Sequence, residues 1–421
     1  MDHTVSEVTH VEPTTRRIEA IDVVRGFALL GILGPNMLAF GWPEQAQWSP
    51  AVIGKSMEML GTGPAHEAAN RAGHLIVEFF FFGKMMFLFS MLFGAGAVLF
   101  ARKFEGEGTT LKTGAVLWYR RMAWLVVIGL VHGVLFWYGD ILVFYALTGM
   151  GMIWWVRRWE PKSLLAAGGG IYVLATVLMV ELISLAVWDH DAGKSDLFAG
   201  IAEQIVGYQG DWSMVFHQRL EDLSFMYLFV FPAYFVFAGS GMMMIGMGLM
   251  RMGVLSGERP IGFYRKLAIV GLGLGCTLTA VAIWGSMQLS ADASGFLFQS
   301  VGQLVGIPMA LGYAGVLILL VKAGRLRRVT HALAAVGRMA LTNYLLQTLI
   351  CTTLFYGYGF GLFARVEYPQ MGLIMLGVWG VNIALSLVWL RFFRFGPMEW
   401  LWRCLTYWRV LPIRASRPGG V

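Results

Sequence analysis

The chain has 421 residues, of which 57% are apolar and 14% are charged, whereas about a quarter of the residues of an average soluble protein are charged. This composition excludes a soluble globular enzyme and predicts a chain whose solvent is mainly lipid. The net charge of +7 does not indicate a nucleic-acid surface, because the basic residues lie between long apolar runs. The three cysteines show no Cys-x-x-Cys spacing, so neither a disulfide nor a structural zinc site is expected.

Apolar segments long enough to cross the roughly 30 Å hydrocarbon core recur along the chain. In lipid, only helices or closed barrels satisfy every backbone polar group. We therefore predict an all-α polytopic membrane protein with about ten transmembrane helices. The predicted spans are Val23–Trp42, Leu75–Ala101, Trp118–Tyr138, Ile141–Val156, Leu164–Val187, Leu223–Met250, Leu267–Leu289, Val301–Val321, Ala332–Phe355 and Met371–Leu390.

The loops between these spans alternate between strongly and weakly basic, and positively charged loops stay in the cytoplasm. Both termini fall on the basic side and are predicted to be cytoplasmic. The basic residues of the other side are Lys55, Arg71, Lys194, Arg219 and Arg365.

The predicted organisation has three parts. A cytoplasmic tail, 1–21, precedes a helical bundle, 22–391, and an amphipathic tail, 392–421, is expected to lie in the cytoplasmic headgroup region. Two long outer loops, near 43–74 and 188–222, are long enough to fold over an outer cavity.

Polar residues mark one face of the first span. Steps of three and four residues connect Asp22, Arg25 and Asn36, and Asn36 lies about 21 Å further along the helix than Asp22. Asp22 and Arg25 either form an interfacial salt bridge or face a ligand. Asn36 has no local need for an amide, so we expect it to pair with another group inside the bundle.

A lysine lies deep in the second span. Lys84 is too far from the surface for its side chain to reach water, so it should have an anionic partner. Glu78, Asp140 and Glu181 are the acids near that depth. The pair is either a structural ion pair or part of a catalytic site.

The residues before Lys84 form a polar stripe. His66, Asn70, His74 and Glu78 recur every four residues and share one helix face. Two histidines and a glutamate are possible metal ligands, but no tetrahedral set is fixed, and no metal is predicted. A solvated face or a substrate vestibule is preferred.

The end of the third span is the most informative stretch. Gly129 and Gly133 allow another segment to approach closely beside His132, the only histidine in any predicted span. Asp140, in the turn that follows, is a candidate to orient the imidazole as a general base, and Trp137 is a candidate binding residue. The alternative is a histidine that only hydrogen-bonds between helices.

The ninth span carries Arg338, Thr342, Asn343 and Gln347. Asn343 and Gln347 are four residues apart on one face, which indicates that they line the same cavity as His132. Arg338 lies near the cytoplasmic end, where a guanidinium either holds a phosphate of a ligand or anchors the helix at the interface.

Several stretches together resemble the YeiB-type family of bacterial inner-membrane proteins, which is defined mainly by a domain of unknown function. They include the motif Asp22-Val-Val-Arg25-Gly26 with Asn36 following. The stretches are Arg17–Ile32, Gly83–Gly96, His132–Leu142, Gly337–Ile350 and Phe395–Arg403. The resemblance implies a multi-pass protein of the bacterial inner membrane.

The first span also resembles that of the transmembrane acyltransferase superfamily, which includes heparan-glucosaminide acetyltransferase and sugar O-acetyltransferases. That resemblance implies transfer of an acyl group from cytoplasmic acyl-CoA to an acceptor on the far side, through a histidine and a nearby asparagine that Asn36 matches. In the heparan enzyme the histidine follows soon after the first span. The segment Gly41–Pro64 has none, so His132 would have to replace it.

The leading hypothesis is therefore membrane acyl transfer. His132 removes a proton from the acceptor while Asp140 orients it, and Asn36 donates to the developing oxyanion. Arg25 and Arg338 hold the phosphates of acyl-CoA, the expected co-substrate. The expected partners are membrane lipids and a small-molecule or glycan acceptor.

A transporter of a small polar solute explains the buried polarity equally well. Its midplane site would use Lys84, Glu78, Asn343 and Gln347. A silent membrane scaffold is the third hypothesis, and it predicts that substitutions of these polar residues are tolerated.

Overall fold

The computed structural model describes residues 18–47, 51–63, 65–104, 111–188, 200–286 and 291–414. All regular secondary structure in these residues is helical. Their one β-type contact is an isolated bridge between Phe393 and Arg414. The predicted all-α class is confirmed. Most of the predicted N-terminal tail and residues 189–199 of the second outer loop lie outside the described residues.

Seven helical segments among the described residues are long and apolar enough to cross a membrane. Three shorter apolar helices, Leu142–Gly151, Val236–Arg251 and Ala340–Phe355, stand where the other three spans are predicted. A membrane protein is thus confirmed, and ten crossings with cytoplasmic termini stay a prediction. The seven segments comprise α2 (Glu19–Gly41), α4 (Glu67–Phe80) with α5 (Lys84–Arg102), α6 (Leu111–Leu135), α9 (Pro161–Trp188), α13 (Ile261–Ser286), α14 (Ala291–Lys322) and α17 (Tyr368–Phe392).

The remaining elements are short or irregular. Two π-helical segments, η3 (Gly149–Ile153) and η5 (Met226–Phe235), continue α7 and precede α12. The others are η2 (Glu44–Gln47), α3 (Ala51–Met59), α7 (Leu142–Thr148), α8 (Trp154–Val156), α10 (Ile201–Gln209), α11 (Trp212–Phe225), α12 (Val236–Arg251), α15 (Arg327–Arg338), α16 (Ala340–Phe355) and α18 (Pro397–Tyr407).

Two spans predicted as continuous helices are broken. The second span is divided into α4 and α5, and Gly83 at the break has φ +72°, a conformation that glycine adopts readily. The ninth span is divided into α15 and α16 at Met339, whose φ of −113° and ψ of 35° are not helical. Hydropathy averaged over a whole span does not detect such breaks, because each one changes the backbone conformation of only a few residues.

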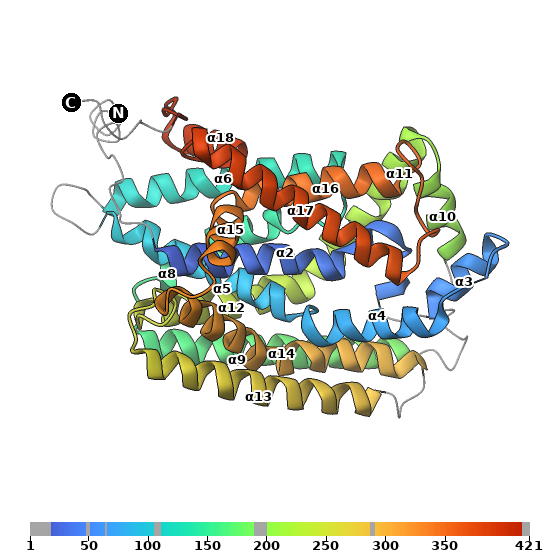
Figure 1. Ribbon diagram of the computed structural model, residues 1–421, viewed down its shortest axis with the longest axis horizontal. Helices are drawn as coiled ribbons and strands as arrows, with labels where there is room; N and C mark the ends of the chain where they lie inside the picture. The colour runs from blue at the N-terminus through green and yellow to red at the C-terminus, as the bar shows by residue number, and fades with distance from the viewer. Residues whose placement is uncertain are drawn as a thin grey trace.

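Helix α2 lies in the middle of the bundle, in contact with α5, α14, α15, α16 and α17 (Figure 1). Its closest neighbour is α15. A Cβ atom added at Gly26 would collide with the carbonyl of Leu333, and one added at Gly337 would collide with the carbonyl of Asp22. Small residues at this crossing bring the two backbones into direct contact.

The two ends of the bundle differ. Helix α2 begins at one end, where α8 and α18 also lie, and α3, α10 and α11 lie at the other (Figure 1). We call the first the basic end, because it carries the arginines of α15 and α18, and the second the opposite end.

The predicted interfacial tail forms α18, which packs against α6 and α16. The Trp402 indole donates to the Arg121 carbonyl at 2.8 Å, and the Arg121 guanidinium lies 3.6 Å from the centre of the Trp402 ring. The tail therefore forms a wall of the bundle as far as it is described, to Arg414.

Candidate active site

His132 and Asp140 form a buried pair. His132 is in the last turn of α6 and is 2% exposed, and Asp140 lies before α7 and is fully buried. The Nδ1 atom of His132 is 2.9 Å from Oδ1 of Asp140. The other carboxylate oxygen accepts a hydrogen bond from the Val143 N–H at 2.9 Å, which fixes the carboxylate at the start of α7. The structure thus brings together the two residues proposed as base and orienting group.

The second ring nitrogen of His132 faces a residue that the sequence analysis missed. Nε2 is 2.9 Å from Oγ1 of Thr348 in α16, a buried threonine. An ionised Asp140 only accepts hydrogen bonds, so Nδ1 of the imidazole donates and Nε2 accepts the Thr348 hydroxyl. The connection hydroxyl, imidazole, carboxylate is that of a catalytic triad. No local spacing pointed to Thr348, because it is 216 residues from His132.

The predicted glycine pair lies against this site. A Cβ at Gly129 would be 2.7 Å from the Val143 nitrogen and 2.8 Å from the Asp140 carboxylate. One at Gly133 would be 3.1 Å from the Tyr227 hydroxyl. The glycines therefore admit the start of α7 and the π-helical segment η5 beside His132.

A cavity of about 960 Å³ opens at the basic end, within the usual size range of small-molecule sites. Its wall contains both arginines that were predicted to hold phosphates. Cations outnumber acids on the wall: the cations are Arg25, Lys103, Arg121, Arg338, Arg394, Arg403 and Arg409, and the acids are Asp22 and Glu399.

The charge of the cavity is not neutralised by its own acids. Arg25 is paired with Asp22 at 3.0 Å, the predicted salt bridge. Burial raises the pKa of Glu399, whose carboxylate accepts from the N–H groups of Leu341 and Thr342 at the start of α16. Burial, Arg403 and Arg121 together lower the pKa of Lys103 to about 8. Such mutual repulsion of cations favours binding of an anion.

The inner end of the cavity reaches the neighbourhood of His132. Ile141, Tyr145 and Tyr344 line it there, and the Tyr344 ring centre is 5.1 Å from that of His132. Ile141 directly follows Asp140. His132 itself is not on the wall, so one ring separates the imidazole from the cavity.

Comparisons with known proteins identify the family. A model described as "Protein of unknown function (DUF418)" matches residues 249–409. The chain is 36% identical over 410 residues to the uncharacterized protein YeiB of Escherichia coli (strain K12), covering 94% of this chain and 97% of that protein. The chain belongs to the YeiB-type family. It is also 32% identical over 420 residues to the uncharacterized protein YxaH of Bacillus subtilis (strain 168), covering 95% and 96%.

His132, Lys84 and Asn36 do not line the basic cavity of this YeiB-type structure. Asn36 is partly buried and has no hydrogen bond to another described residue. It is one helical turn before Phe40, whose ring stacks 4.1 Å from that of Trp137. Asn36 therefore shares a helix face with a residue beside His132.

The structure brings Lys84 to Glu78, one of its three candidate partners, but through the backbone carbonyl of Glu78. Its buried ammonium donates to the backbone carbonyl of Glu78 at 2.7 Å, and within the described part of the chain it has no carboxylate at ion-pair distance. The break at Gly83 frees carbonyls at the end of α4, and Lys84 satisfies one of them. The side chain of Glu181 lies outside the described residues.

The two amides of the ninth span connect helices. The Asn343 amide donates to the Val336 carbonyl at 3.2 Å and to the Ser386 hydroxyl at 2.8 Å, and the Gln347 amide donates to the Leu29 carbonyl at 3.4 Å. Both side chains are buried, and neither lines the basic cavity. These contacts tie α16 to α15, α17 and α2.

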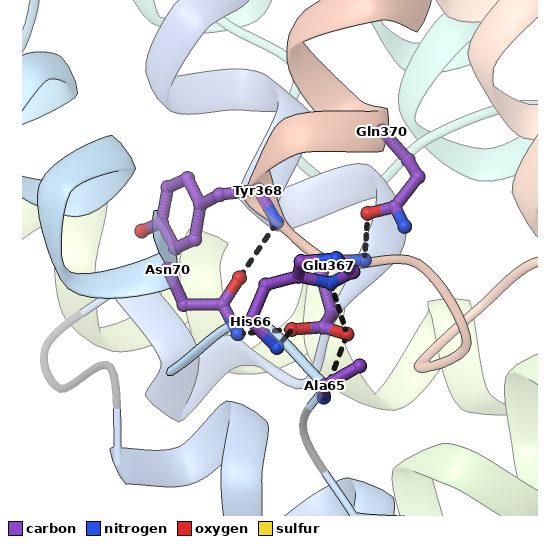
Figure 2. Close-up of polar contacts among 6 residues, drawn as sticks. All are labelled: Ala65, His66, Asn70, Glu367, Tyr368 and Gln370. Carbon is purple, nitrogen blue, oxygen red and sulfur yellow. Dashed lines mark hydrogen bonds and ion pairs between the residues drawn. The ribbon is translucent and has the colours of Figure 1, made fainter. Parts of the chain in front are cut away.

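The polar stripe on α4 docks onto the start of α17. Glu367 accepts from the Asn70 amide at 2.6 Å and from the N–H groups of Ala65 and His66 at 3.0 and 2.9 Å (Figure 2). The Nδ1 atom of His74 lies 2.9 Å from the Tyr368 hydroxyl. The stripe is therefore a helix-to-helix contact, not the solvated face or vestibule that was expected.

Glu367→Gln is expected to lower the stability of this YeiB-type protein by roughly 1.5–3 kcal/mol at pH 7, the usual cost of hydrogen bonds to a charged group. Burial alone would raise the pKa of Glu367, but the hydrogen bonds from Asn70, His66 and Ala65 outweigh burial and lower it. A lowered carboxyl pKa stabilises the fold at neutral pH, and this stabilisation is lost as the pH falls through the folded-state value.

Thermal unfolding in detergent between pH 7 and pH 3.5 checks this prediction. The melting temperature of the wild type should fall more steeply with acid than that of Glu367→Gln. Glu67→Gln is the matched control, because that side chain is 77% exposed. Equal slopes in wild type and Glu367→Gln would show that the contact contributes nothing.

Proposed function

We propose that this YeiB-type protein is a membrane acyltransferase that moves an acyl group from acyl-CoA, bound in the basic cavity, to a hydroxyl or amine acceptor. One observation supports this most. A buried imidazole, oriented by a carboxylate, lies one ring beyond the inner end of a cation-lined cavity. The positively charged loops support a cytoplasmic location for this cavity, and we propose that the membrane is a bacterial inner membrane.

The proposed step balances without a metal or a redox partner. Nε2 of His132 takes the proton of the acceptor hydroxyl as its oxygen attacks the thioester carbonyl carbon. The C–O bond forms, the C–S bond breaks, and the sulfur leaves as CoA thiol after receiving the proton from the imidazolium. Asp140 stabilises that imidazolium. The acceptor hydroxyl takes the place that the Thr348 hydroxyl has at 2.9 Å from Nε2.

Two further roles complete the proposal. The partly buried Asn36 amide, without a partner among the described residues, is proposed to donate to the oxyanion. Arg338 and Lys103 on the cavity wall are proposed to bind the CoA phosphates, while Arg25 is held by Asp22.

Acetyl-CoA is expected to raise the melting temperature of the purified protein in detergent. A ligand at about one hundred times its Kd stabilises the folded state by about 2.7 kcal/mol. Arg338→Gln and Lys103→Gln should each weaken this response about fivefold or more in apparent Kd, because each removes a charged partner of a phosphate.

The control variant is Arg325→Gln, an exposed arginine at the basic end that does not line the cavity. Pyrophosphate at equal ionic strength controls for unspecific anion binding. An unchanged melting temperature with acetyl-CoA would show that the cavity does not bind the acyl donor, and the proposed function would be rejected.

The break between α4 and α5 favours a second candidate, a transporter, because discontinuous helices often form midplane solute sites. The residues proposed for that site are Lys84, Glu78, Asn343 and Gln347. Lys84, Asn343 and Gln347 already hydrogen-bond to neighbouring segments, so this candidate has less support. A transporter would not be stabilised by acetyl-CoA.

A further inference from the structure

Arg219 at the opposite end was predicted to be an exterior loop charge, but its side chain is fully buried in α11. Its Nη1 group donates to the carbonyls of Val134, at 3.2 Å, and Leu135, which caps the end of α6. Its Nε and Nη2 groups have no partner among the described residues. A buried guanidinium that keeps unpaired N–H groups is costly.

The unpaired groups form one edge of the guanidinium. The Nε–H and one Nη2–H bond point in parallel from that edge, which is the geometry that binds two oxygens of a carboxylate or phosphate. Arginine does not lose its proton in proteins, so this demand for an anion persists at every physiological pH.

Other buried donors at this end also lack partners among the described residues. They are the indole N–H groups of Trp42, 1% exposed, and Trp137, 2% exposed, and the hydroxyl of Tyr356, which is fully buried. They come from the ends of α2, α6 and α16. Three helices thus present unpaired hydrogen-bond donors where α11 presents Arg219.

Contacts connect Arg219, Trp137 and Tyr356, and Phe40, two residues before Trp42, stacks on the ring of Trp137. Arg219 binds the carbonyl of Leu135, two residues before Trp137. The Tyr356 ring stacks on Tyr208 at 4.7 Å, and Tyr208 is 6.4 Å from Tyr138, the neighbour of Trp137. Burial raises the pKa of the Tyr356 hydroxyl, and the positive charge of Arg219 acts against that rise.

The nearby acids do not form an ion pair with Arg219. Asp222 accepts from the Tyr208 hydroxyl at 2.5 Å and from the Gln218 amide at 3.1 Å, and no described carboxylate is at ion-pair distance from Arg219. Burial, with Asp222 nearby, raises the pKa of Glu44 to about 7, and burial raises that of Asp222 to about 6. At neutral pH Glu44 is therefore partly protonated, whereas Asp222 is mostly ionised and is held by Tyr208 and Gln218.

We infer that Arg219 and Tyr356, with the indoles of Trp42 and Trp137, form a binding site for the carboxylate or phosphate group of a small molecule at the opposite end of the bundle. The ring centre of His132 is 6.4 Å from that of Trp137 in this site and 5.1 Å from that of Tyr344 in the basic cavity. His132 therefore lies between the two sites. If the proposed function holds, this site receives an anionic acceptor. The anion site itself rests only on the unpaired donors.

The test uses the full chain in neutral phosphatidylcholine nanodiscs, with sodium phosphate or sodium acetate against sodium chloride at equal ionic strength. The melting temperature of the wild type should rise with at least one of the two oxyanions. Arg219→Lys keeps the charge that caps α6 but loses the two-donor edge, and Tyr356→Phe removes one donor only. Each should weaken the apparent affinity, Arg219→Lys by about tenfold or more.

Two controls locate the response. Arg365→Gln changes an exposed arginine of the same end and should behave as wild type. Arg338→Gln changes the basic cavity, so an oxyanion response that survives in it but not in Arg219→Lys belongs to the inferred site. Phosphatidylglycerol nanodiscs test whether the ligand is a lipid headgroup instead of a free anion. A lipid headgroup would make the wild type more stable than Arg219→Lys before any salt is added.

Equal responses of wild type, Arg219→Lys and Tyr356→Phe in both lipids would overturn the inference. That outcome is independent of the proposed function, because acetyl-CoA is tested at the basic cavity. Oxyanion binding without acetyl-CoA binding would retain this site and reject the transferase.

Discussion

His132→Gln is expected to reduce acyl transfer by about 10²–10⁴-fold, the contribution of a positioned general base. Glutamine keeps a polar group beside Thr348 and Asp140 but cannot take up a proton. The measurement supplies acetyl-CoA with a radiolabelled acetyl group to membrane vesicles from cells that overproduce the chain. Label in the lipid and glycan fractions then reports transfer to the natural acceptor.

Thr348 variants sharpen this experiment. Thr348→Ala removes the hydroxyl that is hydrogen-bonded to Nε2 of His132, and Thr348→Ser retains a hydroxyl there. Direct transfer to the acceptor survives both changes, whereas an acyl-enzyme on the hydroxyl would require Ser or Thr. Full label transfer by a folded His132→Gln protein, with normal acetyl-CoA stabilisation, would exclude His132 as the base.

Gly26→Val is expected to cost at least about 3 kcal/mol of stability, the upper part of the usual range for overpacking. The added atoms would meet the Leu333 carbonyl, which belongs to the backbone of α15 and cannot rotate away. The same crossing places Arg25 next to the Gly337 carbonyl, at 3.4 Å, and Arg338 follows directly. Loss of acetyl-CoA stabilisation should accompany the loss of fold.

The yield of monodisperse protein and its melting temperature in detergent measure this effect. Gly273→Val in α13 is the matched control, because a Cβ there meets no atom within 4 Å. A Gly26→Val protein as stable as Gly273→Val would show that the α2–α15 crossing adjusts easily.

The sequence supported the helical membrane class and the His132–Asp140 pair for physical reasons that are local. Hydrocarbon requires long apolar helices, and only eight residues separate His132, at the end of α6, from Asp140, in the short connection to α7. The family resemblance is confirmed by the 36% identity to YeiB over 410 residues. The acyltransferase activity stays a proposal.

Contacts between distant segments were not predictable in this way. Glu367 meets Asn70 across 297 residues, so the stripe was interpreted without its partner. Arg219 follows a polar segment and was assigned to an outer loop, although α11 buries it against the end of α6. The partner of Lys84 depends on a helix break at Gly83 that the apolar run conceals.

The wall that α18 gives to the basic cavity has a consequence for biogenesis. Trp402, Arg403 and Arg409 come from the segment that follows α17 in the chain. A nascent chain that ends after α17 would insert its helices but would lack this part of the cavity wall. The site is therefore complete only after α18 has been synthesised and has packed against α6 and α16.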